Sequence, residues 1–193
     1  MQFIDKKYSI KIPKNNTVLY NTQKNIITVI GPLAKKSLKL KLKIKIFDNK
    51  KIIHVLPTPI TKLSNNSEKK INSLKGTTAA LIKQLLLETS YMLYKKLKFV
   101  GVGYRVFEIE SFKDKLLMLK LGYSHSIFSK TSKDLNIFCL KLTKLFIYGN
   151  SYHNVTQAAS SIKSHKTPEP YKGKGILYDN EIVTLKKGKK SLK

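Results

Sequence analysis

LKFVGVGYRVFEIES, residues 97–111, decides how this chain of 193 residues is organised, because a strand pattern begins here for the second time. Phe107 and Ile109 alternate with Glu108 and Glu110, the period of two that is typical of a half-buried strand. The preceding residues carry apolar side chains at helical spacing, and strands are predicted again upstream of them. An order of strands, helix and strands predicts a fold of the α+β class.

Upstream of the helical pattern, four segments read as strands. They are YSIKI (8–12), NIITVIGP (25–32), the alternating Leu/Ile and Lys run 38–46, and KIIHVL (51–56). The run 38–46 predicts one strand with an apolar face and a lysine face. We expect 51–56 to pair back on it as a hairpin across the turn at Asp48-Asn49.

The remaining segments complete two similar units. A helix is expected from an N-cap at Ser67 to about Leu97, although Gly76 weakens its first turns. Strands follow at 116–124, after a turn at 113–115, and at 135–149. A second helix is expected at 152–164 with Val155, Ala158, Ala159 and Ile162 facing inward. We therefore predict two tandem domains, 1–95 and 96–193, each a small and mostly antiparallel sheet packed on one helix.

The charge points to a polyanionic partner. The chain has 38 Lys and Arg against 11 Asp and Glu, a net charge of +27, although 41% of its residues are hydrophobic. A folded body with this charge repels itself unless a polyanion neutralises it, and nucleic acid is the first candidate. An anionic membrane surface is the second, but it would need a basic amphipathic helix, and the helix expected from Ser67 is apolar along one side and only modestly charged, as a core helix is. A membrane-spanning helix is not expected, because lysines interrupt every apolar run. The N-terminus lacks the pattern of a secretory signal or a transit peptide.

Catalysis and metal binding receive little support. The acids are scattered, and His54, His125, His153 and His165 form no metal-binding spacing. Cys139 is alone among apolar neighbours, which favours a small buried hydrophobic residue. A basic RNA-processing enzyme or nuclease would need a cluster of acids, histidines or metal ligands. We therefore expect no catalytic residues, no metal and no cofactor.

Two features have more than one interpretation. Gly101 and Gly103 superficially resemble part of a phosphate loop, but a β-bulge or a close backbone approach inside a strand is favoured over ligand contact. The lysines of 39–45 form either a solvated strand face, which we favour, or a specific RNA contact.

Two lysine-dense regions remain as candidate nucleic-acid contacts. Glycine and proline free the backbone of the first region and glycine that of the tail, so amides and ammonium groups are expected to bind phosphates, with Tyr171 as a stacking platform. The predicted RNA-binding residues are Lys163, His165, Lys166, Tyr171, Lys172, Gly173, Lys174 and Gly175 in the first region, and Lys186, Lys187, Lys189 and Lys190 in the tail.

The segment PEPYKGKGI, Pro168 to Ile176, resembles the C-terminal signature of large-subunit ribosomal protein six (the L-six family, bacterial type). Further matches stand in the family's order along the chain. They are IKIP (10–13), VIGP (29–32), KGTTAAL (75–81), FVGVGYR (99–105) and LGYSH (121–125). The resemblance covers essentially the whole chain and implies two tandem α+β domains, of which the C-terminal one makes most of the RNA contact.

The resemblance also implies a function and partners. It implies a structural protein that binds large-subunit rRNA near the sarcin–ricin loop and the docking site of translational GTPases, beside neighbouring ribosomal proteins. Arg105 is the only arginine among the 38 basic residues, and Asn and Ile are abundant, which is typical of an AT-rich genome. This bias suggests an organellar member, in a mitochondrial ribosome or, alternatively, in a plastid one.

Overall fold

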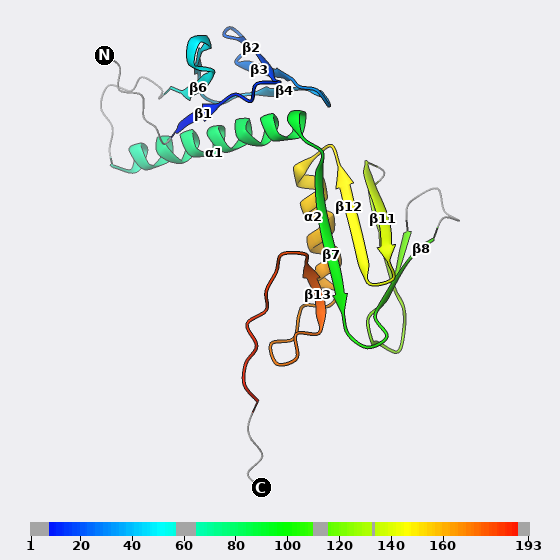
Figure 1. Ribbon diagram of the computed structural model, residues 1–193. Coiled ribbons are helices and arrows are strands. Elements are labelled where there is room, and N and C mark those ends of the chain that lie inside the picture. Colours follow the sequence, from blue (N-terminus) through cyan, green and yellow to red (C-terminus); the bar gives the residue numbers. More distant parts are fainter. Residues whose placement is uncertain (1–7, 57–64, 110–115, 133, 189–193) are drawn as a thin grey trace. The chain divides into compact units, whose positions relative to one another are not determined.

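The computed structural model describes residues 8–56, 65–109, 116–132 and 134–188, in two compact units, Met1–Tyr91 and Met92–Lys193 (Figure 1). Each unit contains antiparallel sheets packed with one helix, so the predicted α+β class is confirmed. The expected turn at 113–115 and Glu110 lie outside the described residues. No helix in the described part of the chain is long and apolar enough to cross a membrane.

The first unit has two three-stranded sheets and the helix α1 (Asn65–Ser90). One sheet has the order β1 (Ser9–Lys11), β6 (Ile52–Val55), β5 (Ile44–Phe47), and the other the order β2 (Thr17–Asn21), β3 (Ile26–Ile30), β4 (Lys35–Lys39). A 3-10 turn, Asp48–Lys50, joins β5 to β6, which confirms the predicted hairpin. The core of this unit includes Ile27, Ile53 and Ile82, all fully buried.

The run 38–46 is not one strand, contrary to prediction. Its first residues are the end of β4 in one sheet, and its last residues are the start of β5 in the other sheet. A bend at Lys41 and Leu42 lies between them. Leu40 and Leu42 remain buried on either side of the exposed Lys41. The apolar alternation therefore continues through the bend, because burial requires these side chains to face the core even where no sheet partner follows. The four lysines of 39–45 are exposed, as predicted.

The helix α1 differs from its predicted bounds at both ends. It begins at Asn65, so Ser67 lies inside the first turn and is not the N-cap, and it passes through Gly76 without interruption. It ends at Ser90, because Leu93 already begins β7 (Leu93–Val100). The predicted end at about Leu97 is too late, since the short apolar run that suggested it fits a helix and a strand equally well.

The second unit contains a four-stranded sheet in the order β11 (Leu135–Lys141), β12 (Lys144–Gly149), β7, β13 (Gly175–Tyr178). A three-stranded sheet has the order β10 (Ile127–Lys130), β9 (Leu116–Lys120), β8 (Arg105–Ile109). The helix α2 (Tyr152–Ser164) has the predicted bounds. It buries Val155, Ala159 and Ile162, and Ala158 is partly buried against the same core.

Gly101 and Gly103 lie in the turn between β7 and β8, and the prediction that they lie inside a strand is wrong. The expected close approach is present at Gly101, where a Cβ would come within 2.8 Å of the Tyr104 ring. Gly103 has a φ of 74°, a conformation that glycine adopts without strain. The two glycines therefore shape a turn that folds Tyr104, itself buried, under the backbone.

Candidate nucleic-acid interface

The candidate interface is the loop between α2 and β13, residues 165–174, which is held at both ends. After the last turn of α2, the amide of His165 donates to Ile162 O at 3.3 Å and that of Lys166 to Lys163 O at 3.2 Å. At the other end, the amide of Ile176 donates to Lys166 O at 2.9 Å. The loop therefore leaves the helix and enters the strand at fixed points.

The loop also closes on itself. The amide of Gly173 donates to Glu169 O and the amide of Glu169 to Lys174 O, both at 2.9 Å, and Gly173 has a φ of 68°. These two amides donate inside the loop and are not available to a ligand, contrary to the free amides expected from the sequence. A bound polyanion would therefore contact mainly the side chains of the loop. Tyr171 and Lys172 are exposed at the tip of this closed loop.

The chain after β13 returns to the same loop. The amide of Lys186 donates to Pro170 O at 2.8 Å, and the position of a Cβ on Gly173 lies 3.4 Å from Leu185 Cδ2. Lys186 and Lys187 are exposed there. The structure thus brings the two predicted lysine regions together, although they are separated in the sequence. Lys189 and Lys190 lie outside the described residues.

A second aromatic residue stands beside the loop and was missed among the predicted site residues. Lys166 Nζ lies 4.3 Å from the centroid of the Tyr123 ring, and the Tyr123 hydroxyl donates to His165 O at 3.2 Å. The rings of Tyr123 and His125 are stacked, with centroids 5.9 Å apart. Both residues belong to the GYSH turn, whose place in the family signature LGYSH was the available signal.

A groove of about 440 Å³ separates this turn from the loop. Its lining residues are Tyr104, Tyr123, Ser164, His165, Lys166, Thr167, Glu169 and Lys174. The groove offers ammonium groups, hydroxyls and aromatic faces, which suit a nucleic-acid backbone and its bases, beside one carboxylate, that of Glu169.

Lys163 is in a different position from the other predicted lysines. Its Nζ makes an ion pair with Glu181 Oε2 at 2.6 Å and lies 4.6 Å from the centroid of the Tyr178 ring. The hydrogen bond from Lys163, together with one from the backbone amide of Tyr178, holds the pKa of Glu181 below its usual range. The charge of Lys163 is therefore partly compensated, and the pair fixes the end of α2 to the residues after β13.

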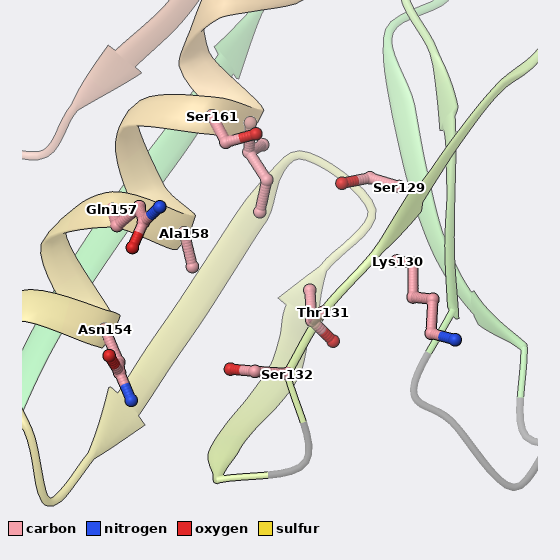
Figure 2. A pocket seen from close by; sticks show the side chains of 9 residues that line it. Ser129, Lys130, Thr131, Ser132, Asn154, Gln157, Ala158 and Ser161 are labelled. Atoms are coloured by element: carbon pink, nitrogen blue, oxygen red, sulfur yellow. The ribbon is translucent and has the colours of Figure 1, made fainter.

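A polar groove of about 290 Å³ lies elsewhere in the second unit, between α2 and the end of β10 (Figure 2). Ser129, Thr131 and Ser132 line one side, and Asn154, Gln157 and Ser161 of α2 line the other. Lys130 points away from the helix, as the strand alternation requires. The lining residues include no carboxylate, histidine or cysteine that could activate the serine and threonine hydroxyls as nucleophiles.

Cys139 is partly buried and packs against the core of the second unit. Its amide donates to a carboxylate oxygen of Glu108. Burial is the larger cause, and the Glu108 carboxylate the smaller one, that together raise the pKa of the Cys139 thiol to about 12. Among the described residues, no group of three or more His, Cys, Asp or Glu side chains could hold a metal ion.

Comparison with known proteins identifies the family. The family model of Ribosomal protein L6 matches residues 100–179. The chain is 40% identical to large ribosomal subunit protein uL6 of Mycoplasmoides gallisepticum, over 93% of this chain and 92% of that protein. It is 35% identical to uL6 of Mycoplasma genitalium, over 94% and 93%, and 33% identical to uL6 of Bordetella petrii, over 95% and 97%. The chain therefore belongs to the ribosomal protein L6 (uL6) family, a family of structural proteins and not of enzymes.

Proposed function

We propose that this chain is a structural component of the large ribosomal subunit and that it binds large-subunit rRNA through the loop 165–174 and the adjoining residues 185–188. The observation that carries the proposal is the hydrogen bond from the Lys186 amide to Pro170 O. It brings the backbone of the tail lysines against the lysine-bearing loop. Family membership supports the ribosomal assignment, since the relatives are named as large-subunit proteins.

Electrostatic attraction between lysines and phosphates supplies the affinity of this contact, and the shape of the loop determines where on the RNA it binds. Lys166, Lys172, Lys174, Lys186 and Lys187 neutralise phosphates, and each neutralised phosphate releases counterions. Such contacts fix position and carry little sequence information. The closed loop supplies the selectivity, because a rigid lysine-bearing surface fits only an RNA whose phosphates stand at matching positions.

Tyr171 and Tyr123 complete this surface. Tyr171 is 54% exposed beside Lys172, and Tyr123 stands next to Lys166. Both rings can stack on an unpaired base that is held by the neighbouring lysine. His165 adjoins Tyr123, because its carbonyl accepts a hydrogen bond from the Tyr123 hydroxyl.

The finer location follows from the resemblance of PEPYKGKGI to the family signature. We place the contact near the sarcin–ricin loop, close to where translational GTPases dock, with other large-subunit proteins as neighbours. Crosslinking from a photoreactive residue at position 172 tests this location, because it should label rRNA at that loop. Crosslinks confined to distant rRNA would contradict it.

The proposed compartment is the mitochondrial ribosome, with a plastid ribosome as the alternative. This part rests on the almost exclusive use of lysine over arginine. The relatives described above are bacterial, so an AT-rich bacterial genome is the competing source of the same bias. Sedimentation of the chain with large subunits from purified mitochondria would support the organelle, and its absence from them would reject it.

Salt dependence tests the binding mode. The affinity of the whole chain for large-subunit rRNA should fall linearly with the logarithm of salt concentration, by about 0.7–0.9 log units per neutralised phosphate for each tenfold rise in salt. Filter binding from low to moderate salt measures this slope. A flat response would reject phosphate-dominated binding.

A further inference from the structure

The four-stranded sheet of the second unit has one face that the α2 core does not account for. Leu97, Leu145 and Ile147 belong to the buried face, in the same core as α2. Because side chains alternate along a strand, the residues between them face the other way. On β7 these are Tyr94 and Lys96, on β12 Phe146 and Tyr148, and on β11 Phe138.

These aromatic side chains form one connected row across three strands. Tyr148 is the register partner of Tyr94, and Phe146 is the partner of Phe138. The ring centroids of Tyr94 and Phe146 are 5.3 Å apart, those of Phe146 and Tyr148 5.8 Å, and those of Phe138 and Tyr148 5.7 Å. Four residues thus make a continuous aromatic surface, the ring row Tyr94, Phe138, Phe146 and Tyr148.

The ring row is open to solvent at both ends. Tyr94 is 55% exposed and Phe138 52% exposed. An antiparallel sheet with one face on a core normally carries polar residues on its other face. A contiguous exposed aromatic patch is instead typical of a binding surface.

The charges around the ring row decide what kind of partner it fits. Lys96 Nζ lies 5.6 Å from the Tyr94 centroid and 5.9 Å from the Phe146 centroid. Lys144 and Lys98 are register partners on the same strands, and Asp179 pairs with Lys98 at 2.6 Å. The Asp179 carboxylate is shared among Lys98, Lys96 and Lys144, so an apolar protein partner would bury more positive than negative charge, which is unfavourable. Unpaired RNA has a base to stack on the rings and a phosphate to meet the lysine.

We propose that the sheet face bearing the ring row and Lys96 is a second RNA-binding surface, which stacks unpaired nucleotides. This deepens the proposed function and rests on it, because it assumes that the chain binds rRNA. The loop 165–174 contacts mainly the phosphates of folded RNA, with Tyr171 and Tyr123 able to stack a base beside it, whereas the ring row holds several bases that have left a helix. The sheet pairs β7 directly with β13, which follows the loop, so both surfaces belong to the same unit.

The test compares unpaired with paired RNA on the whole chain. The probes are a fluorescein-labelled oligouridine of about 10 nucleotides, within the usual site size for such surfaces, and an RNA duplex of the same length. The double variant Phe138→Leu, Tyr148→Leu removes two rings and keeps every lysine. We expect its affinity for oligouridine to fall by about tenfold or more, since each base–ring stack contributes at least several-fold. Affinity for the duplex should change little.

Two controls make the result specific. Tyr91→Leu removes an exposed tyrosine of the first unit and should leave both affinities unchanged. Should the double variant unfold at a lower temperature than the wild type, Tyr94→Leu removes one exposed ring and is expected to lose several-fold in oligouridine affinity alone.

The outcome separates this inference from the proposed function. The wild type should bind oligouridine more tightly than the duplex, because only unpaired bases stack on the rings. The variant Lys172→Ala, Lys174→Ala should weaken rRNA binding and keep this preference. Unchanged oligouridine affinity in the ring variants, or equal affinity of the wild type for both probes, would overturn the ring-row surface even if the loop variant behaves as expected. A ring variant that keeps its RNA affinity and loses crosslinks to another ribosomal protein would also overturn it, in favour of a protein partner.

Discussion

Gly175 and Pro168 lie so close together that no larger residue fits at position 175. A Cβ on Gly175 would come within 2.5 Å of Pro168 Cα, and within 2.8 Å of Pro168 N and Thr167 O, all atoms of the backbone. The beginning of β13 therefore passes directly against the chain that enters the candidate RNA-binding loop. This contact explains why the loop requires glycine there and why its shape depends on it.

Gly175→Ala should destabilise the protein and displace the loop. The methyl group meets backbone, which cannot rotate away, so we expect a loss of about 1–3 kcal/mol in the free energy of unfolding. Denaturant unfolding measures it, and affinity for rRNA should fall in parallel. A variant with wild-type stability would contradict the tight packing.

Gly76→Ala is the matched control, because the same change is made where space is free. Gly76 is exposed in α1, and a Cβ there meets nothing within 4 Å. Alanine should raise the free energy of unfolding by about 0.5–1 kcal/mol, since glycine loses more backbone entropy in a helix.

The ion pair of Lys163 with Glu181 predicts a dependence of stability on pH. The pKa of Glu181 is lowered from 4.5 in the folded protein, so the pair contributes stability that is fully present above 4.5 and is lost as the pH falls through the folded pKa. Glu181→Gln should therefore be less stable than the wild type at neutral pH. The difference should shrink as the pH falls through the lowered pKa of Glu181, and a difference that stays constant into acid would refute the pair as its source.

The Cys139 thiol should react slowly with alkylating reagents at pH 8. Burial, followed by the Glu108 carboxylate, raises its pKa from 9.0 to about 12, so almost no thiolate is present. Glu108→Gln removes the negative neighbour and should speed alkylation under native conditions. Equal rates for the two proteins would show that Glu108 does not influence the thiol.

Asn16 should stabilise the last turn of α1 through hydrogen bonds from its side-chain amide. It is buried, and its Nδ2 donates to Leu86 O at 3.3 Å, to Thr89 Oγ1 at 3.2 Å and to Ser90 Oγ at 2.7 Å. Asn16→Leu leaves the Leu86 carbonyl and the hydroxyls without this donor and should lower the free energy of unfolding by about 1–3 kcal/mol. Asn15→Leu, at the neighbouring exposed position, should have little effect.

The sequence was sufficient for the fold class and for the elements with strong local signals. The helix α2 lies where the spacing of Val155, Ala159 and Ile162 put it. The prediction of one strand over 38–46 was wrong, because alternation indicates which side chains are buried and not whether a strand is continuous. β4 and β5 belong to different sheets. The predicted end of α1 was wrong because residues 89–93 fit the period of a helix and that of a strand equally well.

The candidate interface was predicted only in part, for a physical reason. Lysine density and the family signature located the loop 165–174. The return of Lys186 to Pro170 and the packing of Lys166 on Tyr123 depend on tertiary contacts, which no local pattern encodes. The ring row is a similar case, because the alignment of Tyr94, Phe138, Phe146 and Tyr148 exists only through the pairing of β11, β12 and β7.

Incorporation into large subunits tests the central claim most directly. Large subunits are reconstituted with the Lys172→Ala, Lys174→Ala variant and sedimented, and the bound fraction is compared with that of the wild type. The control is Lys39→Ala, Lys41→Ala, which removes two exposed lysines from the first unit. We predict that the loop variant is incorporated poorly although it folds normally, and that the control is incorporated like the wild type. Incorporation of the loop variant at the wild-type level would contradict the assignment of this loop as the rRNA contact.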